Sequence, residues 1–194
     1  QYVSPSGDDA QDGSSWATAK QSIQSAIDAA TDGDTIFVAE GTYNQSIAAK
    51  QGIHVLGGYS AATGERNPEA YSTILDGTGL EKALIRQNSS FNTITYFDGL
   101  VLQNANHSSN GGAVVLKANG VLNSCSIRDC YTSGSGGAVH NSGGTVANCL
   151  IELCESMGAG GAVHNIGGLV ENTIIRGCKG NYAAIRNENN GIVR

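Results

Sequence analysis

The sequence has few aromatic and few basic residues, and it contains no long apolar run. Aromatic residues make up 6% of the 194 positions, and 17 Asp and Glu outnumber 11 Lys and Arg, for a formal net charge of −6. The basic residues form no cluster, which is unlike a nucleic-acid-binding protein. No stretch approaches the roughly 18 apolar residues of a membrane span, and no signal-peptide pattern opens the sequence at Gln1. We expect no nucleic-acid partner and no membrane span.

Cysteine is also scarce, and the five residues all lie between residues 125 and 178. They are Cys125, Cys130, Cys149, Cys154 and Cys178. An odd number without a CxxC pair is a poor match to a disulfide framework, so we expect mostly free thiols. What the chain has instead is glycine, at 27 positions, with many Ser, Thr and Asn. This bias favours short strands joined by tight turns over helices.

One motif recurs through the second half of the chain. Its copies are Gly111-Gly112-Ala113-Val114, Gly136-Gly137-Ala138-Val139 and Gly160-Gly161-Ala162-Val163, with a degenerate copy at Ala183-Ala184-Ile185. A fixed step of about 24 residues is the signature of a repeat architecture. The apolar runs inside each unit are short and separated by Gly, Asn and Ser, which favours strands stacked in parallel about 4.8 Å apart. The sequence therefore predicts an all-β, single-stranded parallel β-helix.

Position within the repeat predicts which side chains face the core. The inward position holds Val114, Val139, Val163 and Ile185. The next position holds Val115, His140, His164 and Arg186, which cannot form a buried column and so face solvent. After it come Asn141, Asn165 and Asn187, at a bend where stacked Asn side chains can hydrogen-bond between coils.

The N-terminal part follows a different pattern. Residues 18–30 place apolar side chains at helical spacing and predict an amphipathic helix of about three turns, suited to capping a solenoid. Residues 35–38 and 53–56 predict strands. We expect one domain over 1–194, with a cap and first strands at 1–59, irregular coils at 60–107 and regular coils at 108–194. Because residues 191–194 begin another strand without a cap, we expect a longer protein, or self-association through this open C-terminal end.

The N-terminal motifs also carry a family resemblance. They are Tyr2 to Asp9 (YVSPSGDD), Asp12 to Ala19 (DGSSWATA), Ile23 to Ile27 (IQSAI) and Gly33 to Tyr43 (GDTIFVAEGTY). Over residues 2–59 the chain resembles the opening of bacterial secreted pectin-lyase-like β-helix proteins. The later Gly-Gly-Ala-Val-His-Asn units resemble, more loosely, the glycine-rich repeats of polymorphic outer-membrane-protein-type surface β-helices. The resemblance implies a right-handed, three-sided β-helix, a secreted or cell-surface location, and carbohydrate or host surfaces as partners.

The strongest candidate for catalysis is an outward stripe of alternating charge. Arg128, Glu152 and Arg176 lie 24 residues apart. A polysaccharide lyase could use an arginine as the base beside an acid. The same stripe is also explained as a stabilising ladder in which Glu152 pairs with an arginine on either side.

Other outward residues are candidates for binding. His140 and His164, with Arg186 next in line, could contact an anionic sugar, and Tyr131 and Tyr182 could stack on sugar rings. Each of these residues is also explained as a solvent-facing side chain without a ligand.

One acidic loop is the only candidate for a metal. Asp8, Asp9 and Asp12 could hold Ca²⁺, but they do not have EF-hand spacing, and the interpretation as Asx caps of a turn is the one we favour. We expect no cofactor.

These observations favour a secreted or cell-surface module, adhesin-like, that binds a polysaccharide or a host or cell-surface glycan without catalysis. A polysaccharide lyase or glycoside hydrolase acting on acidic polysaccharide is the alternative, and a structural spacer is a third. The fold does not decide between them, because function depends on the site.

Overall fold

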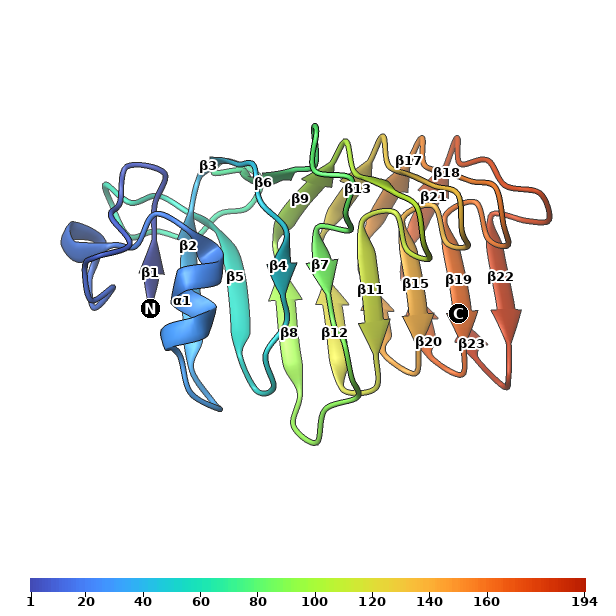
Figure 1. Cartoon of the computed structure of the whole chain (residues 1–194), viewed down its shortest axis with the longest axis horizontal. Helices are drawn as coiled ribbons and strands as arrows, with labels where there is room; N and C mark the ends of the chain where they lie inside the picture. Colours follow the sequence, from blue (N-terminus) through green and yellow to red (C-terminus); the bar gives the residue numbers. More distant parts are fainter.

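The computed structural model describes residues 1–194 as a parallel β-solenoid of about five coils with a 24-residue repeat (Figure 1). Every strand pairing within its sheets is parallel. The predicted fold class is confirmed, including the near absence of helix. Three long sheets run the length of the molecule, and a short fourth sheet lies between the second and the third along the chain.

The first sheet has eight strands, in the order β1 (Tyr2–Val3), β2 (Thr35–Ala39), β5 (His54–Tyr59), β8 (Thr95–Asp98), β12 (Gly120–Asn123), β16 (Thr145–Ala147), β20 (Leu169–Glu171) and β23 (Ile192–Val193). The second sheet has six, in the order β3 (Gly41–Tyr43), β6 (Thr73–Asp76), β9 (Leu100–Gln103), β13 (Ser126–Arg128), β17 (Leu150–Glu152) and β21 (Ile174–Arg176).

The third sheet also has six strands, in the order β4 (Ile47–Ala48), β7 (Ile85–Arg86), β11 (Val114–Lys117), β15 (Val139–Ser142), β19 (Val163–Ile166) and β22 (Ile185–Glu188). The fourth sheet contains β10 (Asn106–His107), β14 (Tyr131–Thr132) and β18 (Glu155–Ser156). Each coil of the regular region contributes one strand to each of the three long sheets, so equivalent residues of successive coils lie side by side.

The N-terminal helix is shorter than the sequence predicted. A 3-10 turn, η1 (Trp16–Thr18), precedes the helix α1 (Ile23–Ala29), and the intervening Lys20 pairs with Val3 instead of joining the helix. Ser22 caps α1 by accepting a hydrogen bond from the Ser25 N–H. The apolar side of α1 is buried as predicted. Figure 1 shows α1 ahead of β4, at the edge of the third sheet, where it covers an otherwise open strand.

The paired glycines of each repeat are required by the backbone. Gly136 has φ +77, and a Cβ there would lie 2.2 Å from the Val139 carbonyl oxygen. A Cβ on Gly137 would lie 2.1 Å from the carbonyl oxygen of Gly161 in the next coil. The first glycine therefore supplies a left-handed turn, and the second lets two coils approach closely.

The asparagine ladder is confirmed; Asn141 and Asn165 are fully buried, and Asn187 is exposed at the C-terminal end of the ladder. The Asn141 amide donates to Asn165 Oδ1 at 2.8 Å, and the Asn165 amide donates to Asn187 Oδ1 at 2.7 Å. The same two amides also donate to the carbonyl oxygens of Gly144 and Gly168. Because the polar atoms are satisfied, amide groups can occupy a core that would otherwise exclude them.

The core is a single apolar column. The inward positions Val114, Val139 and Val163 are fully buried, and one connected cluster of 34 buried residues runs from Val3 to Val170. All five cysteines are free, four of them buried in this column. Burial raises the pKa of Cys149 to about 11. These thiols act as small apolar side chains.

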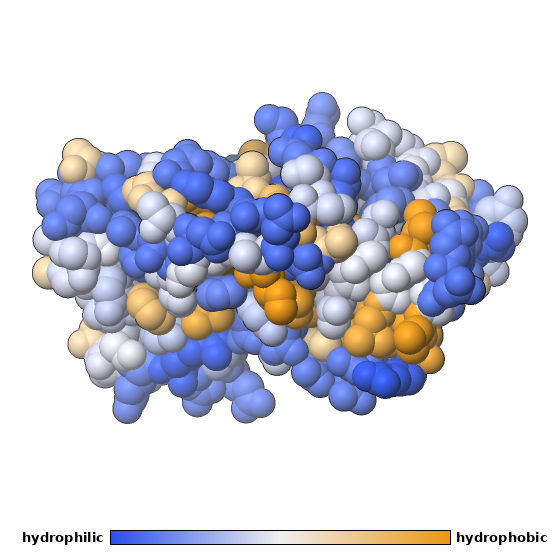
Figure 2. All heavy atoms as spheres, turned by 90° about the horizontal axis from the view of Figure 1, so that it is seen from below, coloured by the Kyte–Doolittle hydropathy of each residue, from blue (hydrophilic) through white to orange (hydrophobic).

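The outer surface is mainly hydrophilic, with separate apolar patches towards the middle and the C-terminal end in the view of Figure 2.

At the N-terminal end, the rings of Tyr2, Trp16, Phe37 and Tyr59 pack against one another with centroids 4.8 to 5.9 Å apart. No helix is long and apolar enough to cross a membrane.

Candidate functional site

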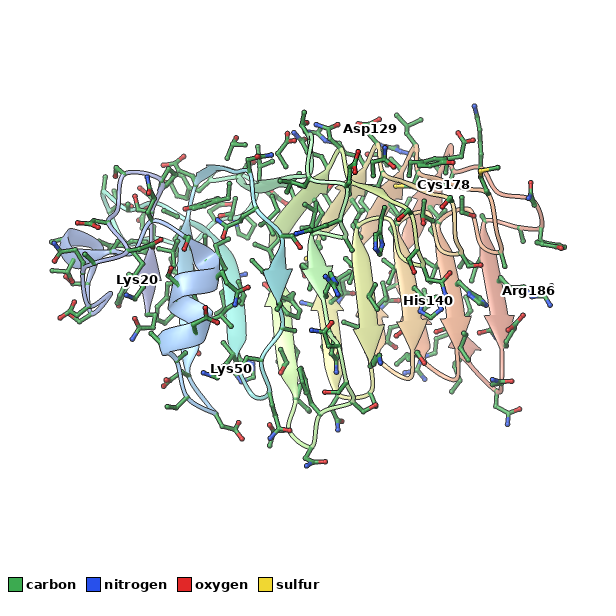
Figure 3. All side chains as sticks on the ribbon, viewed as in Figure 1. Lys20, Lys50, Asp129, His140, Cys178 and Arg186 are labelled. Carbon is green, nitrogen blue, oxygen red and sulfur yellow. The ribbon has the colours of Figure 1, made fainter.

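The outward face of the third sheet carries a row of basic side chains. Register aligns Arg86 of β7, Val115 of β11, His140 of β15, His164 of β19 and Arg186 of β22. Figure 3 shows His140 and Arg186 on these strands. The side chains of His140, His164 and Arg186 face outwards, as the sequence predicted. Arg86 extends the row towards the N-terminal end.

A cleft of about 550 Å³ opens over the first part of this row. Its floor is formed by β7, β11 and β15, and residues 107–110 contribute one side. It is lined by Arg86, Gln87, Asn88, His107, Ser109, Asn110, Val115, Lys117, His140 and Ser142. Val115 is the single apolar side chain among them. The lining therefore offers many hydrogen-bonding groups and one small apolar contact, which differs from the apolar lining typical of drug-like ligand pockets.

The charge of the cleft is opposite to that of the protein. Arg86, His107, Lys117 and His140 line it, and no Asp or Glu does, although the net charge of the chain is −6. Neither Arg86 nor Lys117 forms a salt bridge. Both donate to uncharged oxygens of Asn88. Lys117 Nζ donates to the backbone carbonyl of Asn88 at 2.8 Å, and the Arg86 guanidinium donates to its side-chain oxygen at 3.4 Å. Both cations keep donors for a ligand.

His140 lies at the C-terminal end of the cleft and packs against His164. Their ring centroids are 5.2 Å apart at an interplanar angle of 77°. Burial lowers the pKa of His140, and the neighbouring His164 and Lys117 lower it further. The imidazole is therefore neutral at neutral pH and can accept a proton when an anion is close.

The other end of the basic row is already occupied by a carboxylate of the protein. Glu188 Oε1 accepts a hydrogen bond from Arg186 Nε at 2.8 Å, and Glu188 Oε2 lies 3.4 Å from His164 Nε2. The hydrogen bond from Arg186, followed by that from His164, lowers the pKa of Glu188. Glu188 lies two positions after Arg186 on β22 and reaches His164 diagonally, so strand register does not align this carboxylate with the histidines.

The charged stripe on the second sheet is aligned as predicted, but its pairing differs. Arg128, Glu152 and Arg176 are direct neighbours in β13, β17 and β21. Glu152 forms a salt bridge with Arg176, whereas the Arg128 guanidinium donates to Gln103 Oε1 at 2.7 and 3.1 Å. The expected pairing of Glu152 on both sides is therefore wrong, because Gln103 competes for Arg128. None of the three lines the cleft.

The acidic loop is organised by hydrogen bonds within the protein. Asp9 accepts hydrogen bonds from the backbone N–H groups of Gln21 and Ser22, while Asp8 and Asp12 each cap the residue two positions later. The structure contains no group of three or more His, Cys, Asp or Glu side chains placed to hold a metal ion.

The two tyrosines proposed for sugar stacking also lie outside the cleft. Tyr131 stands on β14 between Asn106 and Glu155. Tyr182 is 72% exposed, with the Arg186 guanidinium 5.7 Å from its ring centroid.

Sequence reasoning missed most of the cleft. Arg86 lies 29 residues before its partner Val115, so the 24-residue step did not align it with the later repeats. His107 is in register with Thr132 at a step of 25, but no feature of the sequence singled it out. A signal was present, because Ala83-Leu84-Ile85-Arg86 has the same apolar-then-basic pattern as Ala183-Ala184-Ile185-Arg186. Aligning these two segments would have placed Arg86 in line with His140.

No family model, no curated protein and no solved structure matches the chain. The structure shows the parallel β-solenoid, and the family resemblance of the N-terminal motifs and glycine-rich repeats stays a prediction from the sequence.

Proposed function

We propose that this β-solenoid is a secreted or cell-surface module that binds a glycan in the cleft over β7, β11 and β15, without cleaving it. The observation that carries the proposal is the lining of the cleft: four basic side chains, amides and hydroxyls, and one apolar residue. Sugars present hydroxyl groups at their edges and C–H groups on their faces. Asn88, Ser109, Asn110 and Ser142 match the hydroxyls, and Val115 offers a contact for a ring face.

The solenoid suits this role because it is rigid along its axis. Arg86 and His140 lie two strand spacings apart, or about 9.6 Å. Their separation is fixed by backbone pairing on both sides of Val115. Binding groups held on paired strands lose little freedom when a ligand arrives, so weak contacts add effectively. A polymer lying along the axis would meet one coil after another.

The proposal is tested by a glycan array with the complete chain, followed by calorimetry on the best ligand. We expect binding that weakens at least tenfold in Arg86→Gln and in Lys117→Gln, because each substitution removes a charge-assisted hydrogen bond of about 1.5 to 3 kcal/mol. Arg128→Gln is the matched control, since Arg128 is a surface arginine of the second sheet outside the cleft.

The same mixtures separate binding from catalysis. A lyase releases unsaturated ends that absorb ultraviolet light, and a hydrolase releases new reducing ends. We expect neither to accumulate. Product formation that disappears in Lys117→Gln or His140→Gln would overturn the non-catalytic proposal, and absence of binding across the array would overturn glycan recognition altogether.

A further inference from the structure

Three cysteines form a ladder on the inner side of the solenoid. Cys130, Cys154 and Cys178 each follow a strand of the second sheet by two residues, and Cys178 is labelled in Figure 3. Strand pairing continues on both sides of Cys154 and Cys178, so their Cα atoms lie one strand spacing apart, about 4.8 Å. This separation is inside the range of about 4.4 to 6.8 Å that a disulfide spans. The register therefore holds these two thiols close enough to be linked.

Cys154 and Cys178 are also in direct contact. The Cys154 backbone N–H donates to Cys178 Sγ at 3.4 Å. The hydrogen bond between the two thiols, followed by burial, raises the pKa of Cys178. Because the thiolate is the form that attacks a disulfide, the pair reacts slowly at neutral pH and faster as the pH rises.

Exposure distinguishes this pair from the other cysteines. Every cysteine except Cys178 is at most 3% exposed, whereas Cys178 is half-buried. Cys154 is buried, but it borders a surface hollow of about 270 Å³. A small oxidant can therefore reach Cys178 from solvent, and its neighbour in the ladder is the thiol next in line.

The turn before Cys178 can adjust to a covalent link. Gly177 has φ +65 and occupies the left-handed position where the two preceding coils have Asp129 and Leu153. A disulfide brings the Cβ atoms to about 3.5 to 4.5 Å, so one backbone segment has to shift by up to about 1 Å from the ladder spacing. Glycine allows such a shift with less strain than a residue that carries a side chain.

We propose that Cys154 and Cys178 form a disulfide between two adjacent coils when the protein meets a small-molecule disulfide such as oxidised glutathione. The Cys178 thiolate attacks one sulfur of oxidised glutathione, which forms a mixed disulfide and releases one glutathione thiolate. The Cys154 thiolate then attacks Cys178 Sγ, which forms the protein disulfide and releases the second. The cysteine pair loses two electrons to the glutathione disulfide, and its two protons end on the two reduced glutathione molecules.

The link closes a loop of one full coil. The loop contains β18, β19, β20 and β21. A disulfide restricts the open states of the segment it closes, so the oxidised coil should open less often than the reduced one. This inference is independent of the proposed glycan-binding function.

The experiment incubates the folded chain with oxidised glutathione at pH 7, 8 and 9. Peptide mapping without reduction locates the disulfides, and alkylation with mass spectrometry counts the free thiols. We expect two of the five thiols to be lost and one linked peptide pair, containing Cys154 and Cys178. The rate of linkage should rise about tenfold per pH unit, since the thiolate fraction does so below the pKa.

Two variants serve as a matched pair. Cys178→Ser should form no linkage and keep its four thiols, whereas Cys130→Ser, on the other side of Cys154, should still form the link. Circular dichroism establishes that both keep the fold. A mixed disulfide that stays on Cys178, no oxidation at any pH, or linkage of Cys125 to Cys149 at the same rate would each overturn the proposal.

Hydrogen exchange tests the effect on the coil. After complete oxidation, the amides of β19 and β20 should exchange at least threefold more slowly than in the reduced chain. Cys178→Ser should show no change after the same treatment. Unchanged exchange in the fully linked chain would contradict the restriction of coil opening.

Discussion

The regular coils at 108–194 and the N-terminal part at 1–107 reach the same fold by different means. In the regular coils identical residues stack, as in the Gly-Gly pairs and the Asn141–Asn165–Asn187 ladder. The N-terminal part uses a helix and a cluster of aromatic rings, and its strands are separated by loops of unequal length. The cleft lies where the two regions meet, with Arg86 from one and His140 from the other. Repetition stabilises the solenoid, and departure from it creates a concave surface.

The largest effect should come from the glycine turns of the regular coils. Gly136 and Gly79 have the same φ of +77, but a Cβ on Gly136 would clash with Val139, and a Cβ on Gly79 would meet nothing within 4 Å. We expect Gly136→Ala to lower the free energy of unfolding by about 3 to 4 kcal/mol, and Gly79→Ala by about 1 to 2 kcal/mol. Urea unfolding measures both. Equal effects would show that only backbone strain matters and that the clash with Val139 does not.

The asparagine ladder should give the next largest effect. Asn165→Ala removes the bonds of a fully buried amide to both neighbouring coils and should cost about 2 to 3 kcal/mol. Asn181, whose exposed side chain also donates to another coil at Met157, is the control. Its replacement by Ala should change the free energy of unfolding by about 0.5 kcal/mol or less. A similar cost at both positions would contradict a special role for the buried ladder.

In the N-terminal part the corresponding polar contact is Asp76. Burial raises the pKa of Asp76, but hydrogen bonds from Thr78, Gln103 and Asn104 outweigh it and bring the pKa to about 2. Because this pKa lies below the unfolded value, the carboxylate stabilises the fold above about pH 4, and that stability is lost as the pH falls towards 2.

We expect Asp76→Asn to lower the free energy of unfolding by about 1 kcal/mol at pH 7, a value reduced for partial exposure, and to have little effect at pH 2. Unfolding curves at the two pH values provide the measurement. Glu69→Gln, at an exposed carboxylate without a hydrogen bond, should be neutral at both. A loss of the same size at pH 2 would show that the charge of Asp76 is not responsible.

The smallest effect should be a gain. Leu153 has φ +53 and is 62% exposed, at a turn where the other coils have Asn104, Asp129 and Gly177. A left-handed conformation suits asparagine better than leucine. We expect Leu153→Asn to raise the free energy of unfolding by about 1 kcal/mol, measured by urea unfolding. A loss instead would mean that Leu153 makes a packing contact that its exposure does not indicate.

The sequence predicted what repeats and missed what does not. The inward valines, the outward histidines and the asparagine ladder followed from a fixed step, since equivalent positions in stacked coils share an environment. The length of α1 did not, because the pairing of Lys20 with Val3 is a tertiary contact that overrides helical spacing. The contact between Glu188 and His164 could not be predicted from the repeat either, because it runs diagonally across the sheet. The cleft was missed because irregular coil lengths hid the alignment of Arg86 with the repeats.

The central claim, that the cleft binds a glycan beside His140, is tested most directly by the titration of His140 itself. Without ligand, nuclear magnetic resonance should give His140 a pKa below the ordinary histidine value, because the ring is buried next to His164 and Lys117. With a saturating glycan ligand identified on the array, the account predicts a shifted pKa of His140, since the bound sugar changes the burial of the ring and its hydrogen bonds, and a matching pH dependence of binding. An unchanged pKa of His140 in the presence of a bound oligosaccharide would contradict it.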